Sequence, residues 1–300
     1  MAGEPDPGSD PTHGFAPLRG ELIGLAYRMT GSLATAEDIA QEAFLRWNAA
    51  DRSVIQLPRA WLLKTTARLS LDHLKSARHR RESYVGPWLP EPLLDSEEPP
   101  QQAAHERAQD ISVAFLLTLQ RLSPAERAVF ILHDLFETPF AEIAGLLGRT
   151  EAACRKLATR AREHLGEARP RQAVAEEEAR RIAQAFFAAS RDGDEASLRA
   201  LLAGDVVLHT DGGGIRNAAR NLIQGAEKVG RFFAGLARKR PEPPPLLHLG
   251  RINSLPGYVT LEADGLPQTT ALDIRDGQIV AIYIMRNPEK LGSVRARLSG

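Results

Sequence analysis

Hydrophobic residues recur every three or four positions through the first half of the chain, the spacing of one helix face. Proline and glycine punctuate the pattern: Gly31 breaks one helix, and Pro58 opens another at a position where proline is tolerated. The pattern predicts helices over about residues 18–30, 35–48, 58–81, 105–119, 124–136, 139–147 and 151–165. The first half is therefore expected to be all-α.

The periodicity changes after residue 174. Two helices over about 179–192 and 195–203 are expected to precede a strand at 205–210 and a further helix at 226–237. Strand-like stretches follow at 246–252, 258–263, 269–275 and 279–286. Asp-Gly pairs at 264–265 and 276–277 separate three of them, which is a strong hairpin signal. Helices followed by a meander of strands predict an α+β domain.

Three segments show neither the helical nor the strand periodicity of hydrophobic residues. Residues 1–17 are rich in proline, glycine and aspartate and are expected to be a disordered tail. Residues 87–104 contain five prolines and four acids, which is typical of a linker. Within this linker Trp88 and Leu89 are expected to dock on a surface, with Pro90 and Pro92 stiffening the segment. The expected domains are therefore 18–86, 105–167 and, after a polar hinge, 174–291.

Composition places the chain among globular proteins. It has 300 residues, 43% of them hydrophobic, a formal net charge of zero and one cysteine, Cys154. No intramolecular disulfide is possible, which fits a reducing cytoplasm. The N-terminus lacks the pattern of a signal peptide, and no apolar run approaches the ~18 residues of a membrane span. No His/Cys metal spacing is evident, so no metal or cofactor is expected.

Charge is unevenly distributed along the chain. Between Arg52 and Arg81 there are eight Lys or Arg residues and one acid, Asp72. A basic helix with a tryptophan near its start suits phosphate contact beside unstacked bases, although a merely solvated basic face is the alternative. The nucleic-acid candidates here are Arg52, Arg59, Trp61, Lys64, Arg68, Lys75 and Arg78.

Residues 138–165 read as two helices joined by a tight turn. Gly148 permits the turn, and Thr150 can cap the second helix. Along that helix Cys154, Ala158 and Leu165 lie on one side, while the charged residues lie largely on the other. A helix of this kind after a short turn suits reading of a DNA major groove. An ordinary helical hairpin with a solvated face fits this stretch equally well.

Longer segments carry a family resemblance. TAEDIAQEAFLRW and PRAWLLKTTARLSLDHLKSARHRR resemble region 2 of extracytoplasmic-function sigma factors of the sigma-70 family. LSPAERAVFILHDLFETPFAEIAGLLGRTEAACRKLATRARE resembles their region 4. WLPEPL, DGGG and NPEKL resemble motifs of a subgroup with a C-terminal SnoaL-like domain. The implied fold is two all-α domains followed by an α+β SnoaL-like, ketosteroid-isomerase-like cone.

The resemblance implies promoter recognition. Region 4 would place the helix from Thr150 in the major groove of the −35 element, with Arg155 and Lys156 as the main base-reading candidates. The other candidates are Glu151 and Thr159 for bases and Arg149, Arg160 and Arg162 for phosphates. Region 2 would open the −10 element, its single-stranded bases held by the loop at 49–57 against Arg59, Lys64 and Arg68.

The resemblance also implies protein partners. The acidic helix face formed by Glu37, Asp38, Gln41 and Glu42 would dock on the β′ coiled coil of core RNA polymerase. The β subunit is a further expected contact, no membrane is expected, and an anti-sigma partner stays an open question.

The C-terminal domain is expected to regulate the sigma factor in cis. It would pack across the linker and set the spacing of regions 2 and 4, through contacts of Asp211 and the following glycines with the segment near Trp88 and Glu91. The residues of this interdomain contact are Trp88, Leu89, Pro90, Glu91, Pro92, Asp211, Gly212, Gly213, Gly214, Asn287 and Pro288.

Other functions compete with this interpretation. SnoaL-like cones include enzymes, and the acid–base candidates here are His209, Asp211, Glu262 and Asp273. We expect no enzymatic activity, because no catalytic pattern is evident among them. The alternative is a DNA-binding regulator whose SnoaL-like domain binds a small-molecule effector or retains enzyme activity. Region 2 argues against a conventional regulator, which needs no strand-opening module.

Overall fold

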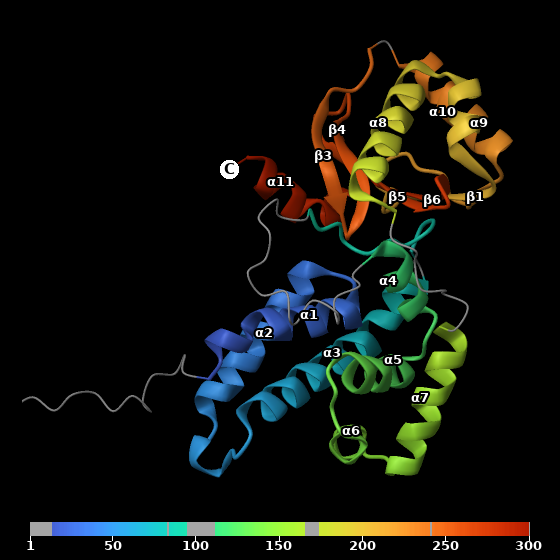
Figure 1. The fold of residues 1–300 in the computed structure, drawn as a ribbon. Helices are drawn as coiled ribbons and strands as arrows, with labels where there is room; N and C mark the ends of the chain where they lie inside the picture. Colours follow the sequence, from blue (N-terminus) through green and yellow to red (C-terminus); the bar gives the residue numbers. More distant parts are fainter. Residues whose placement is uncertain (1–13, 83, 95–111, 166–173, 241, 300) are drawn as a thin grey trace, which may run out of the picture. The chain divides into compact units, whose positions relative to one another are not determined.

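The computed structural model describes residues 14–82, 84–94, 112–165, 174–240 and 242–299, with no side chains described at 77–82. Most of the expected tail, the second half of the expected linker and the expected helix start near His105 lie outside these residues. The chain divides into two compact units, Met1–Arg81 with Thr118–Ala168, and Glu82–Leu117 with Arg169–Gly300 (Figure 1).

The first unit begins with three helices, α1 (Arg19–Thr30), α2 (Leu33–Ala49) and α3 (Pro58–Glu82). Gly31 has a left-handed φ of 74° and ends α1, and the Ser32 hydroxyl then accepts a hydrogen bond from the Thr35 amide to cap α2. Leu22, Leu25 and Leu62 are fully buried between the helices. The predicted all-α fold of this segment is confirmed.

Four further helical segments follow, α4 (Val113–Gln120), α5 (Pro124–Phe130), α6 (Phe140–Leu147) and α7 (Glu151–Leu165). Ser123 and Glu126 form a complete capping box at the start of α5. The expected helix over 124–136 continues past Phe130 as a π-helical turn, Ile131–Leu135. Gly148, with a φ of 60°, makes the turn between α6 and α7, so the predicted helix-turn-helix is present.

One buried arginine connects the two helical parts of the first unit. Arg127 on α5 is 3% exposed, and its Nη1 donates a 2.6 Å hydrogen bond to the carbonyl of Met29 on α1. Its Nε donates to the Leu119 carbonyl at 2.8 Å. Burying a guanidinium is costly unless its N–H groups donate hydrogen bonds. The Met29 and Leu119 carbonyls provide acceptors for Arg127 and so stabilise its burial.

The second unit is built on a six-stranded sheet with the order β2-β1-β6-β5-β4-β3. The strands are β1 (Leu202–Asp211), β2 (Ile223–Gln224), β3 (Leu246–Ile252), β4 (Leu255–Leu261), β5 (Pro267–Arg275) and β6 (Gln278–Met285). Every pair is antiparallel except β1 with β6, which is parallel.

Tight turns connect the antiparallel strands. Asp276 and Gly277 both have positive φ, as a two-residue hairpin turn requires, so this predicted hairpin is confirmed. Gly265 also has a positive φ, in the turn between β4 and β5. The turn between β3 and β4 uses Asn253 and Ser254 at φ of 49° and 59°, where the sequence has no glycine and the hairpin was not expected.

Different segments cover the two faces of this sheet. Helices α8 (Glu176–Asp192), α9 (Glu195–Leu201) and α10 (Ala226–Lys239) form the cone with one face, as Figure 1 shows. The opposite face, termed the linker face below, packs against Leu89, Val113 and the helix α11 (Gly292–Leu298). The α+β prediction is confirmed, and the fold continues beyond Leu291 through α11, which was not expected.

Among the described residues, no helix combines the length and the apolar character that a membrane crossing needs.

Candidate nucleic-acid interface and linker-binding site

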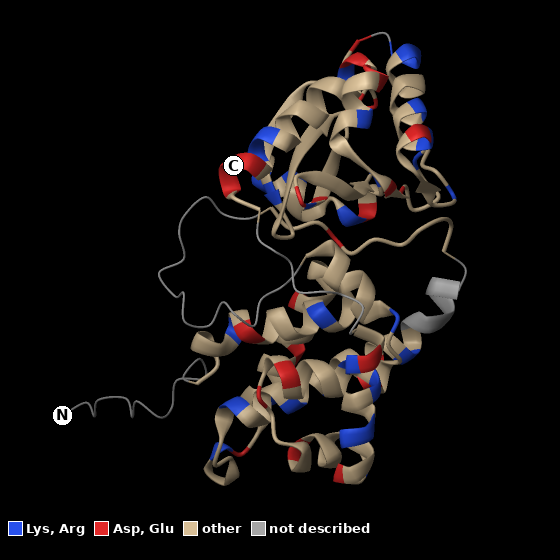
Figure 2. Cartoon of the chain, turned by 45° about the vertical axis from the view of Figure 1, so that its right-hand side comes forward, with Lys and Arg blue, Asp and Glu red and all other residues tan. Residues whose placement is uncertain are grey.

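The second helix of the helix-turn-helix presents a polar face. Thr150 Oγ1 accepts a hydrogen bond from the Ala153 amide and so caps α7. Cys154, Ala158, Ala161 and Leu165 are buried on one side. The exposed residues of the other side and of the preceding turn are Arg149, Thr150, Glu151, Arg155, Lys156, Thr159, Arg160 and Arg162, with the cations blue in Figure 2. An exposed basic face on this helix is suited to a DNA groove.

Local contacts order some of these side chains. Arg155 Nη2 lies 2.6 Å from Glu151 Oε2, one turn earlier, and the guanidinium lies 5.5 Å from the centre of the Phe140 ring. Arg162 pairs with Asp134 at 2.6 Å, which holds it against the π-helical turn. Both arginines are therefore in ion pairs within the protein: Arg155 pairs with Glu151, which is exposed on the same helix, whereas Arg162 pairs with the less exposed Asp134 of the π-helical turn.

The basic surface of α3 is also present. Arg59, Lys64, Arg68 and Lys75 are exposed, and the Arg78 side chain lies outside the described residues. Arg59 pairs with Glu21 on α1, and Lys75 pairs with Asp72 at 3.1 Å. This leaves Lys64 and Arg68 as cations for which no ion pair is found within the described residues.

The tryptophan predicted to meet bases is half-buried. The centre of the Trp61 ring lies 5.7 Å from that of Trp47, and the Arg52 guanidinium lies 5.6 Å from the centre of the Trp47 ring. The loop before α3 instead exposes two apolar side chains, Val54 at 73% and Leu57 at 66%. These were missed in the sequence, although apolar residues in an otherwise polar loop are a usable signal.

The acidic residues of α2 share one face. Glu37, Asp38 and Gln41 are exposed, and Glu42 is half-buried and pairs with Arg46 at 2.8 Å. The opposite face of the helix is buried. The expected polymerase-facing residues are therefore together on the surface.

In the second unit, the linker is bound by a buried carboxylate. Asp211 is completely buried at the end of β1, and it accepts hydrogen bonds from Tyr84 Oη at 2.6 Å and the Leu89 amide at 2.9 Å. It also accepts from the Gly213 amide at 2.9 Å and from Lys290 Nζ at 2.8 Å. Four donors satisfy the charge, which is the condition for burying a carboxylate without a large penalty.

Lys290 and Asn287 complete this contact. Lys290 Nζ donates to the Leu89 carbonyl at 2.7 Å and lies over the rings of Trp88 and Tyr84 at 4.1 and 4.7 Å. Asn287 Nδ2 donates to Tyr84 Oη at 2.9 Å. We call Tyr84, Leu89, Asp211, Asn287 and Lys290 the linker clasp. Burial and the nearby Asp211 carboxylate raise the pKa of Tyr84, which keeps its hydroxyl a donor.

The linker continues along the sheet edge beyond the clasp. The Asn253 amide donates to the Leu93 carbonyl at 2.8 Å, and Asn253 Oδ1 accepts from the Leu93 amide at 3.2 Å. Leu94 forms an antiparallel bridge with Ile252. Pro90, Glu91 and Pro92 are buried, and Ser293 Oγ donates to the Pro92 carbonyl at 3.3 Å. The predicted docking of Trp88 and Leu89 thus extends to Leu94.

The glycines after Asp211 leave room for these groups. Gly213 has a φ of 65°, and a Cβ there would lie 2.4 Å from the Asn287 side chain. A Cβ at Gly212 would lie 2.1 Å from the Arg216 carbonyl oxygen. Any side chain at either position would displace part of the loop, and at Gly213 it would displace the clasp.

The acid–base candidates are not assembled into one site. His209 and Asp273 pair in register with Tyr283 and Ala281, which places both on the linker face. Burial lowers the pKa of His209 to about 4, so its ring is neutral at pH 7. Asp273 pairs with Arg275 at 3.2 Å. Within the described residues no group of His, Cys, Asp and Glu is placed to hold a metal ion.

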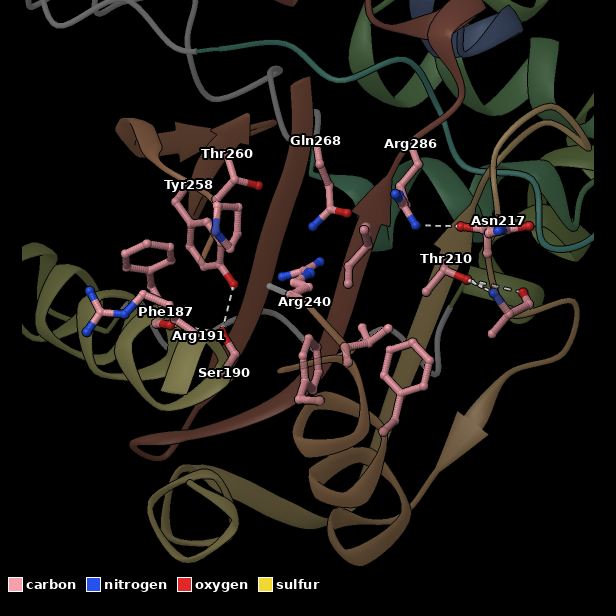
Figure 3. Close-up of a pocket in the computed structure, with 17 residues that line it drawn as sticks. Phe187, Ser190, Arg191, Thr210, Asn217, Arg240, Tyr258, Thr260, Gln268 and Arg286 are labelled. Atoms are coloured by element: carbon pink, nitrogen blue, oxygen red, sulfur yellow. Dashed lines mark hydrogen bonds between the residues drawn. The ribbon is translucent and has the colours of Figure 1, made fainter. Parts of the chain in front are cut away.

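The cone encloses a cavity of 260 Å³ between its helices and the sheet (Figure 3). Aromatic side chains line it together with Arg191, which pairs with Asp192, and with Arg240 and Arg286. Neither Arg240 nor Arg286 was singled out from the sequence, because one follows a helix and the other follows a strand, and only the fold brings them together.

Comparisons with known proteins match both helical modules and the whole chain. Residues 15–80 match the model of sigma-70 region 2, and residues 112–165 match that of sigma-70 region 4. The ECF RNA polymerase sigma factor SigJ of Mycobacterium tuberculosis is 40% identical, over 92% of this chain and 91% of that protein. The probable ECF sigma factor SigI of the same species is 33% identical, over 94% and 95%.

A solved structure agrees with these matches. The crystal structure of Mycobacterium tuberculosis SigJ superposes with a TM-score of 0.75 and 37% identity, covering 94% of this chain and 98% of that one. The chain therefore belongs to the extracytoplasmic-function RNA polymerase sigma factors, in the subgroup that has a C-terminal SnoaL-like domain.

Proposed function

We propose that this sigma factor reads promoter DNA with two separate surfaces, α7 for the −35 element and α3 with its preceding loop for the −10 element. The observation that supports this most directly is the exposed polar face of α7, on the second helix of a helix-turn-helix. Base edges in the major groove are read by side chains from such a helix.

On α7, Arg155 and Lys156 are the residues for base edges. The ion pair with Glu151 orders the Arg155 side chain on the exposed face, and a planar guanidinium can make the bidentate contact that reads guanine. Arg149 and Arg160 lie at the margins of this face and would contact phosphates. Arg162 is bound to Asp134, which makes it a weaker candidate for DNA than the sequence suggested.

The −10 surface combines apolar and basic groups. Val54 and Leu57 project from the loop into solvent, and Lys64 and Arg68 are exposed on the helix that follows. Apolar side chains can contact an unstacked base while the cations hold the backbone. In this proposal Trp61 does not stack on DNA. It packs against Trp47 and so stabilises the position of the loop.

The acidic face of α2 is our candidate for docking to core polymerase. Its residues are exposed and adjacent, as a charged docking surface requires. We infer the β′ coiled coil as its target, with further contacts to the β subunit. This surface explains how a DNA-reading protein can have a net charge of zero.

We further propose that the C-terminal unit regulates transcription in cis by controlling the length of the connection between regions 2 and 4. The clasp holds Tyr84, two residues after the end of α3. Val113, the first residue of α4, is buried in the cluster on the linker face. One domain therefore holds both ends of the segment that joins the promoter-reading regions.

No catalytic role is proposed for the cone. His209 and Asp273 lie on the linker face, and Asp211 is committed to the clasp. Only Glu262 lies near the cavity, where arginines neutralise it. A general base needs a free carboxylate or imidazole within reach of a substrate, and this arrangement does not offer one.

Run-off transcription with purified core polymerase and a promoter library tests the main proposal. The full chain is expected to form a complex with core and to initiate from a limited set of promoters. Replacing Glu37 and Asp38 by alanine should weaken the complex with core, while replacing the exposed Glu176 and Glu177 of α8 should not. Failure of the full chain to bind core or to initiate would overturn the proposal.

A further inference from the structure

The cone cavity has an apolar wall. Its apolar lining comes from Phe187 of α8 (labelled in Figure 3), from Phe232, Phe233 and Leu236 of α10, and from Ile284 of β6. Its 260 Å³ is slightly below the roughly 300–1,000 Å³ of sites that bind drug-sized molecules. A cavity of this volume with aromatic lining suits a single flat ring with a short substituent.

The other side of the cavity is cationic. Arg240 Nη2 lies 2.9 Å from Glu262 Oε2, and Arg286 Nη2 lies 3.8 Å from the same oxygen. Glu262 is almost fully buried beside the cavity, so two guanidinium groups share one carboxylate. Arg216, the neighbouring cation, pairs separately with Asp264 at 2.7 Å. One positive charge is left uncompensated among these groups.

Arg286 has unused hydrogen-bonding capacity at this position. Its Nη1 donates to the Asn217 carbonyl at 2.6 Å, but its buried Nε has no hydrogen-bond partner among the described residues. Burial, and next the nearby Arg216, lower the pKa of Arg286. A partly buried cation, such as Arg286 with its side chain 22% exposed, gains from an added anion, because its lost hydration is then replaced.

Neutral donors surround the same space. Tyr258 Oη is 3.5 Å from Ser190 Oγ, the outer limit of a hydrogen bond, and Thr270 is its other hydroxyl neighbour, so a ligand acceptor would compete only with weak neutral partners. Burial raises the pKa of Tyr258 to about 12, which keeps this hydroxyl protonated. Gln268 lines the cavity between Tyr258 and Arg286, as Figure 3 shows. Tyr258, Gln268 and Arg286 therefore each offer a hydrogen-bond donor to an acceptor bound in the cavity.

We propose that the cone cavity binds a small monocarboxylate with one ring, its carboxylate held by Arg240, Arg286 and Tyr258 and its ring packed on the phenylalanines. A monoanion matches the single uncompensated charge. A phosphate dianion would exceed it, and a neutral ring would leave the Arg286 donor unsatisfied. The proposal concerns binding, so it depends neither on promoter recognition nor on regulation in cis.

A ligand bound in this cavity would lie next to the residues that hold the linker. Thr210 and Arg286 line the cavity, and the next residue of each segment, Asp211 and Asn287, belongs to the clasp. The Arg286 amide donates to the Asp211 carbonyl at 2.7 Å, which joins the two segments at this point. Any regulatory effect of the ligand rests on the proposed cis regulation and is a separate question from binding.

Isothermal titration of the full chain tests the site. The probes are benzoate, phenylacetate and cyclohexanecarboxylate, each compared with its own carboxamide, which has the same shape but no charge. At least one carboxylate should bind saturably and ten or more times more tightly than its amide. Replacing Arg286 by methionine should weaken that binding tenfold or more.

Two further variants test whether weaker binding by Arg286→Met reflects the lost contact or a misfolded protein. Tyr258→Phe removes only a hydroxyl and should weaken binding severalfold without lowering the melting temperature of the free protein. Arg231→Met changes an exposed arginine on α10 that pairs with Glu227, and it should bind like the wild type. Absence of saturable binding by all three carboxylates, equal binding of the amides, or unaltered binding by both Arg286→Met and Tyr258→Phe would overturn the proposal.

Discussion

At the residue scale, the linker clasp depends on one buried carboxylate. Asp211 is fully buried, and the Lys290 ammonium beside it has a side chain only 14% exposed. Each charge therefore needs the other, since a buried unpaired charge is strongly destabilising. The motif residues Asp211, Asn287 and Trp88 were singled out from the sequence, but Tyr84 was not, because an isolated tyrosine next to a helix end gives no signal.

Asp211→Asn should release the linker. The substitution removes the negative charge with which Lys290 forms a buried ion pair, and breaking such a pair typically costs about 3–5 kcal/mol. Denaturant unfolding should show a loss of stability of this order, with faster amide exchange at Leu89. Asp205→Asn is the matched control, because Asp205 is exposed on the same strand. The same unfolding free energy and the same amide exchange at Leu89 in the two variants would contradict the assigned role of Asp211.

His209 should make the C-terminal unit sensitive to acid. Its folded pKa of about 4 is below the ordinary value of 6.5, so the unfolded chain takes up the proton first. Stability should be fully present above about pH 6.5 and fall toward pH 4, by at most about 1.4 kcal/mol per pH unit from this group.

The measurement is the melting temperature of the protein between pH 7 and 4.5. His209→Gln, which does not titrate, should flatten this dependence, whereas substitution of the half-buried His248 should leave it in place. An unchanged slope in His209→Gln would show that other groups cause the acid sensitivity.

At the scale of elements, we propose that different residues of α7 and its preceding turn read bases and bind phosphates. Arg155→Ala should cost about 1–3 kcal/mol at one base pair and relax the preference there. Arg149→Ala should weaken binding to all promoters about equally and reduce the salt dependence of the DNA-binding constant. Selection of −35 sequences by holoenzyme containing each variant distinguishes the two effects. A preference unchanged in Arg155→Ala would show that this residue does not read bases.

Elements with strong local signals could be predicted from the sequence. The capping box at Ser123, the glycine turn at Gly148 and the Asp-Gly hairpin at 276–277 all depend on short-range chemistry. The short strand β2 and the helix α11 were missed, because tertiary packing rather than local propensity stabilises such short elements.

Sites that depend on the fold were harder to predict. Arg240 and Arg286 are 46 residues apart in the sequence, and they share Glu262 only because the sheet curves around the cavity. Val54 and Leu57 lie in a loop, where an apolar residue can be buried or exposed, so the sequence flags them but only the fold shows that they are exposed. The partners of Arg162 likewise follow from packing against the π-helical turn.

At the scale of the whole molecule, two promoter-reading regions are joined through a segment that the third domain binds at both ends. Flexible linkers tolerate many separations, whereas a bound linker restricts them. The clasp at Asp211 and the buried Val113 therefore predict a narrow range of permitted distances between the two promoter elements.

Run-off transcription on promoters whose −35 to −10 spacer varies by single base pairs tests this claim most directly. The full chain with core polymerase should initiate efficiently at one or two spacer lengths, and Asp211→Asn should broaden or shift that optimum while Asp205→Asn keeps it. The same spacer profile for the full chain and Asp211→Asn would contradict the claim that the C-terminal domain sets the spacing.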